Sequence, residues 1–251
     1  MNLQIIATAH NGFSDKFGIP RQSQETSSIE TKIVFEPTFR DENMLRGIEG
    51  YSHLWLIWEF SQIGSRGVEG RGVGATGNRL QATVRPPRLG GNTRVGVFAT
   101  RSPFRPNRLG LSSVELVRVE KTATEGTVLI VRGADLLDGT PIYDIKPYLS
   151  YSDSHPDARN GFGETTKDYK LKVDWSTIHN SPSGAQSTLH HPQSTIATQV
   201  AHQIEEILSQ DPRPAYQSDP ERIYKLDYAG WKVCFRVEEE TAYIVKIEKN
   251  N

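Results

Sequence analysis

Residues 95–116 read VGVFATRSPFRPNRLGLSSVEL, and the fold class follows from how this stretch is built. The apolar run 95–99 predicts a β-strand, and the alternation of apolar and polar residues over 113–119 predicts a second strand. Two prolines, Pro103 and Pro106, lie in the nine residues 100–108 between them. Each proline removes a backbone donor and fixes φ, so this segment is expected to be a stiff loop between two strands.

The same strand pattern recurs through the first 150 residues. Eight short runs rich in Val, Ile, Thr and aromatic residues are separated by Gly and Pro turns: 3–9, 31–36, 53–60, 80–84, 94–100, 113–120, 127–133 and 141–146. One short helix is expected at 40–47, with Asp41 as its cap. Strands without intervening helical patterns predict a closed or nearly closed β-barrel. A parallel βαβ sheet is the weaker alternative, because no long amphipathic helices separate the strands.

The chain is expected to divide into three parts. Residues 1–151 form the predicted barrel, 152–194 have the composition of a polar linker or extension, and 195–251 form a small α+β domain. In this domain an apolar helical stripe (Ile196, Val200, Ile204, Ile207 and Leu208) ends at the DPRP sequence of residues 211–214. About three antiparallel strands are expected after it, at 222–228, 231–237 and 242–247. The predicted fold class is therefore mainly β with a small C-terminal α+β domain.

Positive charge is concentrated in one region of a nearly neutral chain. Overall, 29 Lys and Arg face 30 Asp and Glu. From Arg66 to Arg108 there are nine arginines and no lysine against one acid, Glu69, which is a local balance of +8. A solvated charged face is the ordinary explanation of such a run. Because the arginines coincide with proline-stiffened loops, an anionic, phosphate-bearing partner is favoured instead.

Composition narrows the class of protein. No apolar stretch approaches the roughly 20 residues that span a bilayer, and residues 1–6 lack the features of a signal peptide. The single cysteine, Cys234, excludes an intramolecular disulfide and a cysteine-based zinc cluster. Five of the seven histidines fall in predicted loops or the linker, and no metal site is expected from them. A cytoplasmic protein without a membrane partner is expected.

Two further motifs can be interpreted only from the residues around them. Residues 72–77 match GxGxxG, but no strand precedes them, no helix follows, and no acid lies about 20 residues on, so a flexible loop is expected. In DLLDGTP, residues 135–141, two carboxylates flank an Asp-Gly turn. This turn is either ordinary hairpin chemistry or a site that holds a ribose or accepts a proton, and the spacing leaves both interpretations open.

Several sequence blocks in unbroken order resemble one family. They are GIPRQ at 18–22, GYSHLWLIWEF at 50–60, TVRPPRLGGN at 83–92, VGVFATRSPFRPN at 95–107, DLLDGTPIYDIKPY at 135–148 and DPRPAY at 211–216. Together they resemble the TsaA/TrmO family of tRNA methyltransferases. The resemblance implies a TsaA-like β-barrel and methyl transfer from S-adenosylmethionine to N6 of N6-threonylcarbamoyladenosine at position 37, beside the anticodon of threonine tRNA. It also implies a homodimer, with the cofactor site close to the dimer interface.

The resemblance assigns roles to individual residues. It implies cofactor contacts from Pro20, Arg21, Gln22, Ser61, Gln62, Arg101, Leu111, Leu137, Asp138, Gly139 and Thr140. The proton acceptors proposed for catalysis are Asp138 and Tyr216. Contacts with the anticodon stem-loop are expected from Arg85, Arg88, Phe104, Arg105, Asn107, Arg108, Asp211 and Arg213, with Phe104 as a stacking platform.

The sequence departs from the family pattern in three places. Arg108 stands where a proline is common, residues 64–78 form a Gly-rich insertion, and the 152–194 linker is long and polar. A second hypothesis from a different class is a non-catalytic tRNA- or nucleotide-binding module. A third, a barrel whose prolines and arginines only stabilise turns, explains the positive region poorly.

Overall fold

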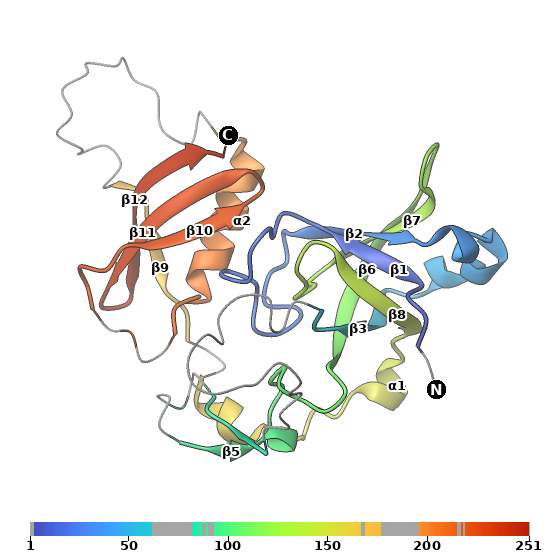
Figure 1. Cartoon of the computed structure of the whole chain (residues 1–251), viewed down its shortest axis with the longest axis horizontal. Coiled ribbons are helices and arrows are strands. Elements are labelled where there is room, and N and C mark those ends of the chain that lie inside the picture. The colour runs from blue at the N-terminus through green and yellow to red at the C-terminus, as the bar shows by residue number, and fades with distance from the viewer. Residues whose placement is uncertain are drawn as a thin grey trace, which may run out of the picture.

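The computed structural model describes residues 3–61, 82–86, 89, 93–166, 169–176, 196–214, 217 and 219–250. Two parts lie side by side (Figure 1): a strand-rich part formed by the first half of the chain, and a smaller part in which one helix packs on a sheet. Strands dominate both parts, so the predicted mainly β fold class is confirmed.

Six antiparallel strands build the first part. They are β1 (Ala7–His10), β2 (Glu30–Phe35), β3 (His53–Glu59), β6 (Leu109–Thr122), β7 (Gly126–Arg132) and β8 (Thr140–Pro147). They pair in the order β1-β2-β7-β6-β3-β8, and β8 pairs again with β1, which closes a barrel. Along β3, buried and partly exposed residues alternate strictly, because successive side chains point to opposite faces of the sheet.

The segment from 80 to 100 differs from the prediction. Among the residues of this segment that the structure describes, the strands are β4 (Thr83–Val84) and β5 (Val95–Gly96), which pair with each other in a separate two-stranded sheet. The predicted strand 94–100 is wrong beyond Gly96, since the chain turns into a 3-10 helix, η5 (Val97–Ala99). The turn is closed by Thr100, whose backbone N and Oγ1 both donate to Val97 O, at 3.2 and 2.8 Å.

The region between β2 and β3 consists of short turns. The expected helix at 40–47 is only a 3-10 turn, η2 (Glu42–Leu45), flanked by η1 (Pro37–Phe39) and η3 (Ile48–Gly50). Asp41 caps η2 as predicted, because its Oδ1 accepts from Asn43 N at 2.9 Å. After the barrel, α1 (Ser150–Asp153) and η6 (Gly161–Thr166) are also short.

The second part is a four-stranded sheet covered by one helix. Strands β10 (Tyr224–Tyr228), β11 (Trp231–Glu238) and β12 (Thr241–Lys249) are antiparallel, as predicted, and α2 (Thr198–Ser209) follows the predicted apolar stripe. Inside the expected linker, β9 (Lys172–Asp174) pairs in parallel with β12. Leu171 and Trp175 on either side of β9 are buried, so this stretch belongs to the sheet despite its polar surroundings.

The structure has two hydrophobic clusters, and one of them contains residues of both parts. One cluster fills the barrel, whereas a second cluster combines α2 and the sheet with three residues of the first part: Phe13, Ile29 and Leu137. Ile29 is 1% exposed and Leu137 is 9% exposed. The connection between β1 and β2, which contains GIPRQ, therefore runs between the barrel and α2 (Figure 1).

Candidate functional site

The GIPRQ turn lies where the two parts of the molecule meet. Its first residue, Gly18, has φ +96°, and a Cβ there would clash with the Leu226 side chain of β10, so only glycine fits this close approach. Pro20 is buried. Glu25 Oε2 accepts from the backbone N of Arg21 at 3.1 Å and of Gln22 at 3.3 Å, which fixes the turn.

Arg21 is directed toward the second part of the molecule. Its Nη2 donates to Asp211 O at 3.2 Å and to Arg213 O at 2.6 Å. Two of the sequence blocks, GIPRQ and DPRPAY, are therefore in contact although they lie about 190 residues apart along the chain.

Gln22 joins the GIPRQ turn to the loop 100–108, which holds Arg101, Arg105 and Arg108 and is called the arginine loop below. Arg101 Nη1 donates to Gln22 Oε1 at 2.5 Å across 79 residues of sequence. Arg101 is exposed, and its guanidinium has further N–H donors beyond this bond. Two residues predicted to bind a cofactor thus converge on one point.

A half-buried carboxylate, that of Asp135, lies near Arg101. Asp135 Oδ1 accepts from Ser112 Oγ at 2.5 Å, and Ser112 Oγ in turn accepts from Trp58 Nε1 at 2.8 Å. Burial raises the pKa of the Asp135 carboxyl, and the Ser112 hydrogen bond and the charge of Arg101 oppose this rise. Asp135 was not among the predicted site residues. Its signal in the sequence was the first carboxylate of DLLDG, which is equally typical of a hairpin turn.

The 137–140 turn presents one side chain to solvent. Leu137 and Thr140 are buried, and Thr140 Oγ1 donates to Leu137 O at 2.7 Å. Asp138 is 47% exposed, and its Oδ1 lies 3.2 Å from His10 Nδ1 and accepts from Asn11 N at 3.1 Å. Asp138 is therefore the member of the turn whose side chain can exchange a proton, whereas Leu137 and Thr140 offer backbone atoms.

The loop after β5 is braced internally. Arg105 is half-buried, and its Nη1 donates to the carbonyls of Thr100 at 2.7 Å and Ser102 at 3.4 Å. On the outside of the loop, Phe104 is 43% exposed, and Phe98 is 77% exposed. Sequence reasoning missed Phe98 because it was expected inside a strand.

The other predicted residues of this region lie in several positions. Arg85 and Asn107 are exposed, and Arg108 is half-buried. Leu111, on β6, is 56% exposed, and Ser61 follows the end of β3. Because β3 pairs with β6, with Glu59 opposite Leu109, Ser61 and Leu111 belong to neighbouring strand ends.

Asp211 and Arg213 pair with one another. Arg213 Nε and Nη2 donate to the two carboxylate oxygens of Asp211 at 2.7 and 2.9 Å. The side chain of Arg213 is 11% exposed and that of Asp211 is 15% exposed. Tyr169 OH also donates to Asp211 Oδ2, at 3.2 Å. The hydrogen bond to Asp211 raises the pKa of Arg213 further. Their predicted contact with tRNA stays a prediction, but these side chains are already engaged.

Some predicted residues lie outside the described part of the chain. They are Gln62, Arg88 and Tyr216, together with the Gly-rich segment 64–78 and its GxGxxG match. Among the residues that the structure describes, no group of three or more His, Cys, Asp and Glu side chains is arranged to hold a metal ion.

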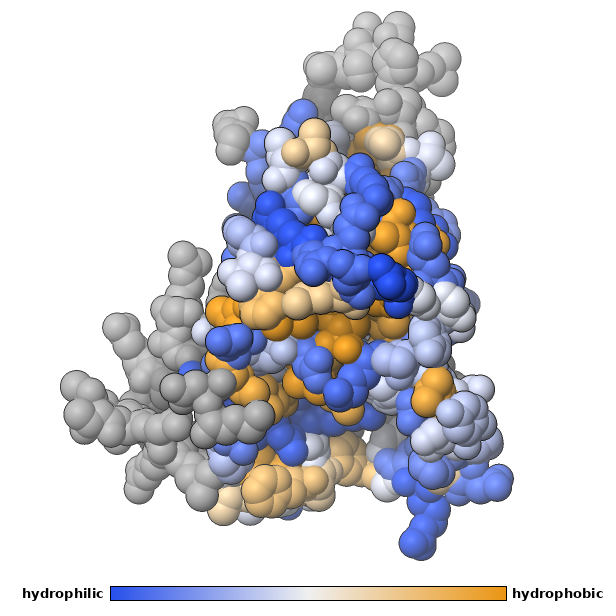
Figure 2. All heavy atoms as spheres, turned by 90° about the vertical axis from the view of Figure 1, so that its right-hand side faces the viewer, coloured by the Kyte–Doolittle hydropathy of each residue, from blue (hydrophilic) through white to orange (hydrophobic). Residues whose placement is uncertain are grey.

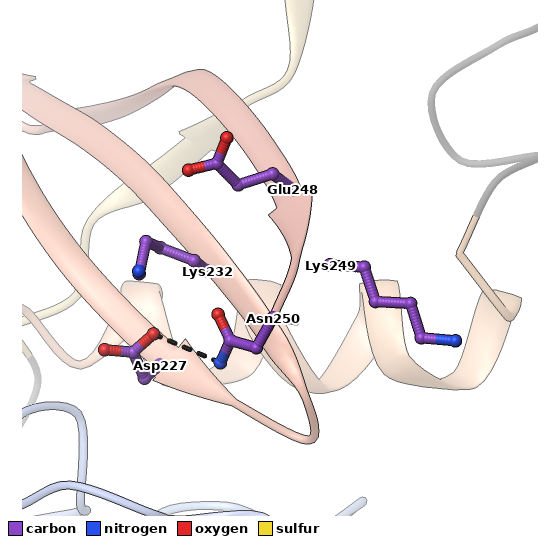
Figure 3. Close-up of a pocket in the computed structure, with 5 residues that line it drawn as sticks. All are labelled: Asp227, Lys232, Glu248, Lys249 and Asn250. Atoms are coloured by element: carbon purple, nitrogen blue, oxygen red, sulfur yellow. Dashed lines mark hydrogen bonds between the residues drawn. The ribbon is translucent and has the colours of Figure 1, made fainter.

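An open hollow at the end of the second sheet has a different character. It is lined by Asp227, Lys232, Glu248, Lys249 and Asn250, which Figure 3 shows on β10, β11 and the end of β12. Asn250 Nδ2 donates to Asp227 Oδ1 at 3.4 Å. None of these residues belongs to the sequence blocks, so the hollow is not the candidate site.

Comparison with known protein families covers both parts of the chain. Residues 8–154 match the tRNA-methyltransferase O N-terminal domain, and residues 169–250 match the TrmO C-terminal domain. The chain is 46% identical over 195 residues to a tRNA (adenine(37)-N6)-methyltransferase of Eikenella corrodens, covering 77% of this chain and 95% of the relative. It is 36% identical over 232 residues to the Escherichia coli protein of the same name, covering 92% and 89%.

A solved structure gives the same result. The crystal structure of TrmO from Pseudomonas aeruginosa superposes with a TM-score of 0.71 at 29% sequence identity, and the match covers 100% of this chain and 97% of the other. The likeness therefore extends over both the barrel and the second part.

Proposed function

The chain belongs to the TrmO family, and on this basis we propose that it methylates N6 of N6-threonylcarbamoyladenosine at position 37 of threonine tRNA. It is a tRNA (adenine-N6)-methyltransferase with S-adenosylmethionine as its methyl donor. The structural observation that supports a methyl-donor site is the convergence of Gln22, Arg101 and Asp135, three residues from separate family blocks, at one place on the barrel.

The cofactor site of the proposal is formed by two turns and the arginine loop. Residues 20–22 and 137–140 supply the turns, Arg101 supplies a charged donor, and Ser61, Gln62 and Leu111 complete the site. The exposed guanidinium of Arg101 fits a carboxylate such as that of the methionine moiety, because its donors form a planar fork. When bound, S-adenosylmethionine supplies an electrophilic methyl group on a sulfonium.

Most of the catalytic work in this proposal is positioning. In-line transfer requires the nucleophilic nitrogen to lie behind the methyl group, and holding that geometry lowers the barrier. The threonylcarbamoyl group makes the N6–H more acidic, so a modest base suffices to take the proton. Asp138 is the proposed acceptor, with Tyr216 as the second candidate. Both contacts that fix Asp138 are to Oδ1, and nearly half of its side chain faces solvent.

The tRNA is proposed to lie against the arginine loop. Contacts with phosphates are assigned to Arg85, Arg88, Arg105, Asn107 and Arg108, and Phe104 is the proposed stacking platform. The exposed ring of Phe98, in η5 just before this loop, is a second aromatic surface of the same segment. Because base 37 lies in a loop, exposing it costs less than flipping a base from a duplex.

Assembly, domain division and localisation are also proposals. A homodimer agrees with apolar surface on the barrel: Figure 2 shows apolar residues among polar ones on the side of β2 and the turns at 37–50, where Met44 of η2 is 63% exposed. The first domain is proposed to span 1–151, and the second begins near residue 169, where the TrmO C-terminal domain match starts. A cytoplasmic location is proposed for a tRNA-modifying enzyme. Over the described ranges, no helix has the length and apolar character to cross a bilayer.

The proposed function is tested by methyl transfer from radiolabelled S-adenosylmethionine to threonine tRNA with and without the threonylcarbamoyl group. Label on the modified tRNA alone supports the proposal. Label on unmodified tRNA would overturn the substrate assignment. Binding of tRNA and cofactor without transfer would favour a non-catalytic module.

The cofactor site is tested separately with Arg101→Ala. We expect the Kd for S-adenosylmethionine to rise about tenfold, since a charge-assisted contact with a carboxylate is lost. The matched control is Arg236→Ala on β11, which removes an arginine that pairs with Glu238 at 2.9 Å within the second sheet. An unchanged Kd for Arg101→Ala would contradict the assigned site.

A further inference from the structure

The second domain holds the segment that carries the GIPRQ turn. Residues 18–29 contain no helix or strand, and α2 packs along them (Figure 1). Glu206 of α2 accepts hydrogen bonds from the backbone N atoms of Ser27, at 2.5 Å, and Ser28, at 3.0 Å, and from both hydroxyls. Although desolvation opposes it, these hydrogen bonds lower the pKa of Glu206. A carboxylate on α2 therefore holds four donors of the segment.

Two glutamines of the second domain add to this hold. Gln203 Nε2 donates to Ser28 O at 3.0 Å, and Gln210 Nε2 donates to Glu25 O at 3.1 Å. Gln203 and Gln210 are both 8% exposed. The side chain of Glu25 accepts from the backbone N of Arg21 and Gln22. By binding the carbonyl of Glu25, Gln210 therefore also helps to hold the GIPRQ turn.

The DPRP turn contacts the GIPRQ turn directly. Its backbone carbonyls at Asp211 and Arg213 both accept from Arg21 Nη2. These carbonyls face Arg21 because the turn is held in a specific shape: Asp211 has φ +48°, a conformation that few non-glycine residues adopt. The Asp211–Arg213 ion pair and the hydrogen bond from the Tyr169 hydroxyl stabilise this shape.

We propose that Asp211 and Arg213 are positioning residues for the cofactor-binding turn, acting through their backbone carbonyls on Arg21. The side-chain pair fixes the shape of the DPRP turn, the carbonyls of that turn fix Arg21, and Gln22 is thereby held against Arg101. The guanidinium of Arg21 is engaged by the second domain and its backbone N by Glu25, so the contact of this turn with the cofactor is assigned to the side chain of Gln22. This proposal rests on the cofactor site proposed above. It differs from a direct contact of Asp211 and Arg213 with tRNA.

The two roles are separated by the kinetics of Arg213→Gln in the full-length protein. Side-chain contacts of Arg213 are with Asp211, so the substitution loosens the turn without removing a donor from the cofactor site. We expect the KM for S-adenosylmethionine to rise about tenfold, with kcat at saturating S-adenosylmethionine changing less than about twofold. The KM for tRNA is expected to stay within about twofold of the unaltered enzyme.

Other patterns would overturn the proposal. A raised KM for tRNA with an unchanged KM for S-adenosylmethionine would assign Arg213 to the tRNA surface. A lower kcat with both KM values unchanged would mean that the pair only keeps enzyme molecules folded. Arg236→Gln is the matched control, because Arg236 also pairs with a carboxylate two residues away but lies on β11.

A second variant keeps the test decisive if Arg213→Gln does not fold. Asp211→Asn keeps the size of the side chain but removes one of the two carboxylate oxygens that accept from Arg213, and the same rise in the KM for S-adenosylmethionine is expected. An unchanged KM for this variant would refute the proposal. Arg101→Ala, run in parallel, separates the two hypotheses. If Arg101→Ala leaves cofactor binding intact, the assigned cofactor site is wrong. If Arg101→Ala weakens cofactor binding but the variants of the second domain leave it intact, the cofactor site stands and the positioning role is wrong.

Discussion

Gly110 on β6 is where a single methyl group should disturb the site most clearly. A Cβ at this position would lie 2.7 Å from Trp58 Cδ2 and closer still to two other atoms of the indole. Trp58 has little room to move, because it is 5% exposed and packs edge-on against Phe60 with ring centroids 4.3 Å apart. Gly110→Ala is therefore expected to displace the indole.

The magnitude follows from two effects of that displacement. Overpacking a core costs about 1–3 kcal/mol, and loss of the Trp58–Ser112 hydrogen bond costs about 1 kcal/mol more. The lower chain entropy of alanine offsets about 0.5–1 kcal/mol. We therefore expect a net destabilisation of about 1–3.5 kcal/mol and, for a chain of this size, a Tm lower by about 2–14 °C.

Calorimetry of three single variants and one double variant checks this reasoning. Gly96→Ala is the matched control, because a Cβ there meets nothing within 4 Å and its φ of −56° suits alanine. It should lie within about 1 kcal/mol of the unaltered protein, on the stabilising side. Trp58→Phe makes room for the methyl group, so its combination with Gly110→Ala should be less destabilising than the sum of the two. A Gly110→Ala stability within about 0.5 kcal/mol of the unaltered protein would refute the argument.

Four other outcomes are expected. Burial raises the pKa of Asp135, so this carboxyl stabilises the fold fully at a pH below its unfolded pKa, and the stabilisation is lost as pH rises through its folded pKa. Asp135→Asn should therefore raise Tm more at pH 8 than at pH 4. Desolvation opposes the effect, but Arg132 and Arg118 lower the pKa of Glu30. Glu30 therefore stabilises the fold at a pH above its unfolded pKa, and this stabilisation is lost as pH falls through its folded pKa. Glu30→Gln should make Tm depend less on pH in the acid range. Phe104→Ala should lower tRNA affinity about 5- to 100-fold in filter binding if the ring stacks on a base, and an unchanged affinity would exclude stacking. Affinity for tRNA should also fall steeply with added salt, whereas a flat response would remove the arginine loop from the interface.

Local patterns in the sequence were sufficient for many elements. The run of apolar and aromatic residues over 53–60 predicts β3. The spacing of apolar residues from Ile196 to Leu208 predicts α2, because side-chain burial repeats with the helical period. The pattern failed for 94–100, where an apolar run forms a 3-10 turn and leaves Phe98 exposed. It also passed over β9, since three residues are too few to show a period.

The sequence by itself determined the mainly β class, the helix of the second domain and the blocks that place the chain in its family. The tertiary structure decided which blocks meet. Arg21 lies 192 residues from Arg213, and Arg101 lies 79 residues from Gln22, so no local period relates them. The single signal for Asp135, a carboxylate before an Asp-Gly turn, fits a hairpin equally well. Its burial beside Ser112 and Trp58 arises only when β3 and β6 pair and the barrel closes.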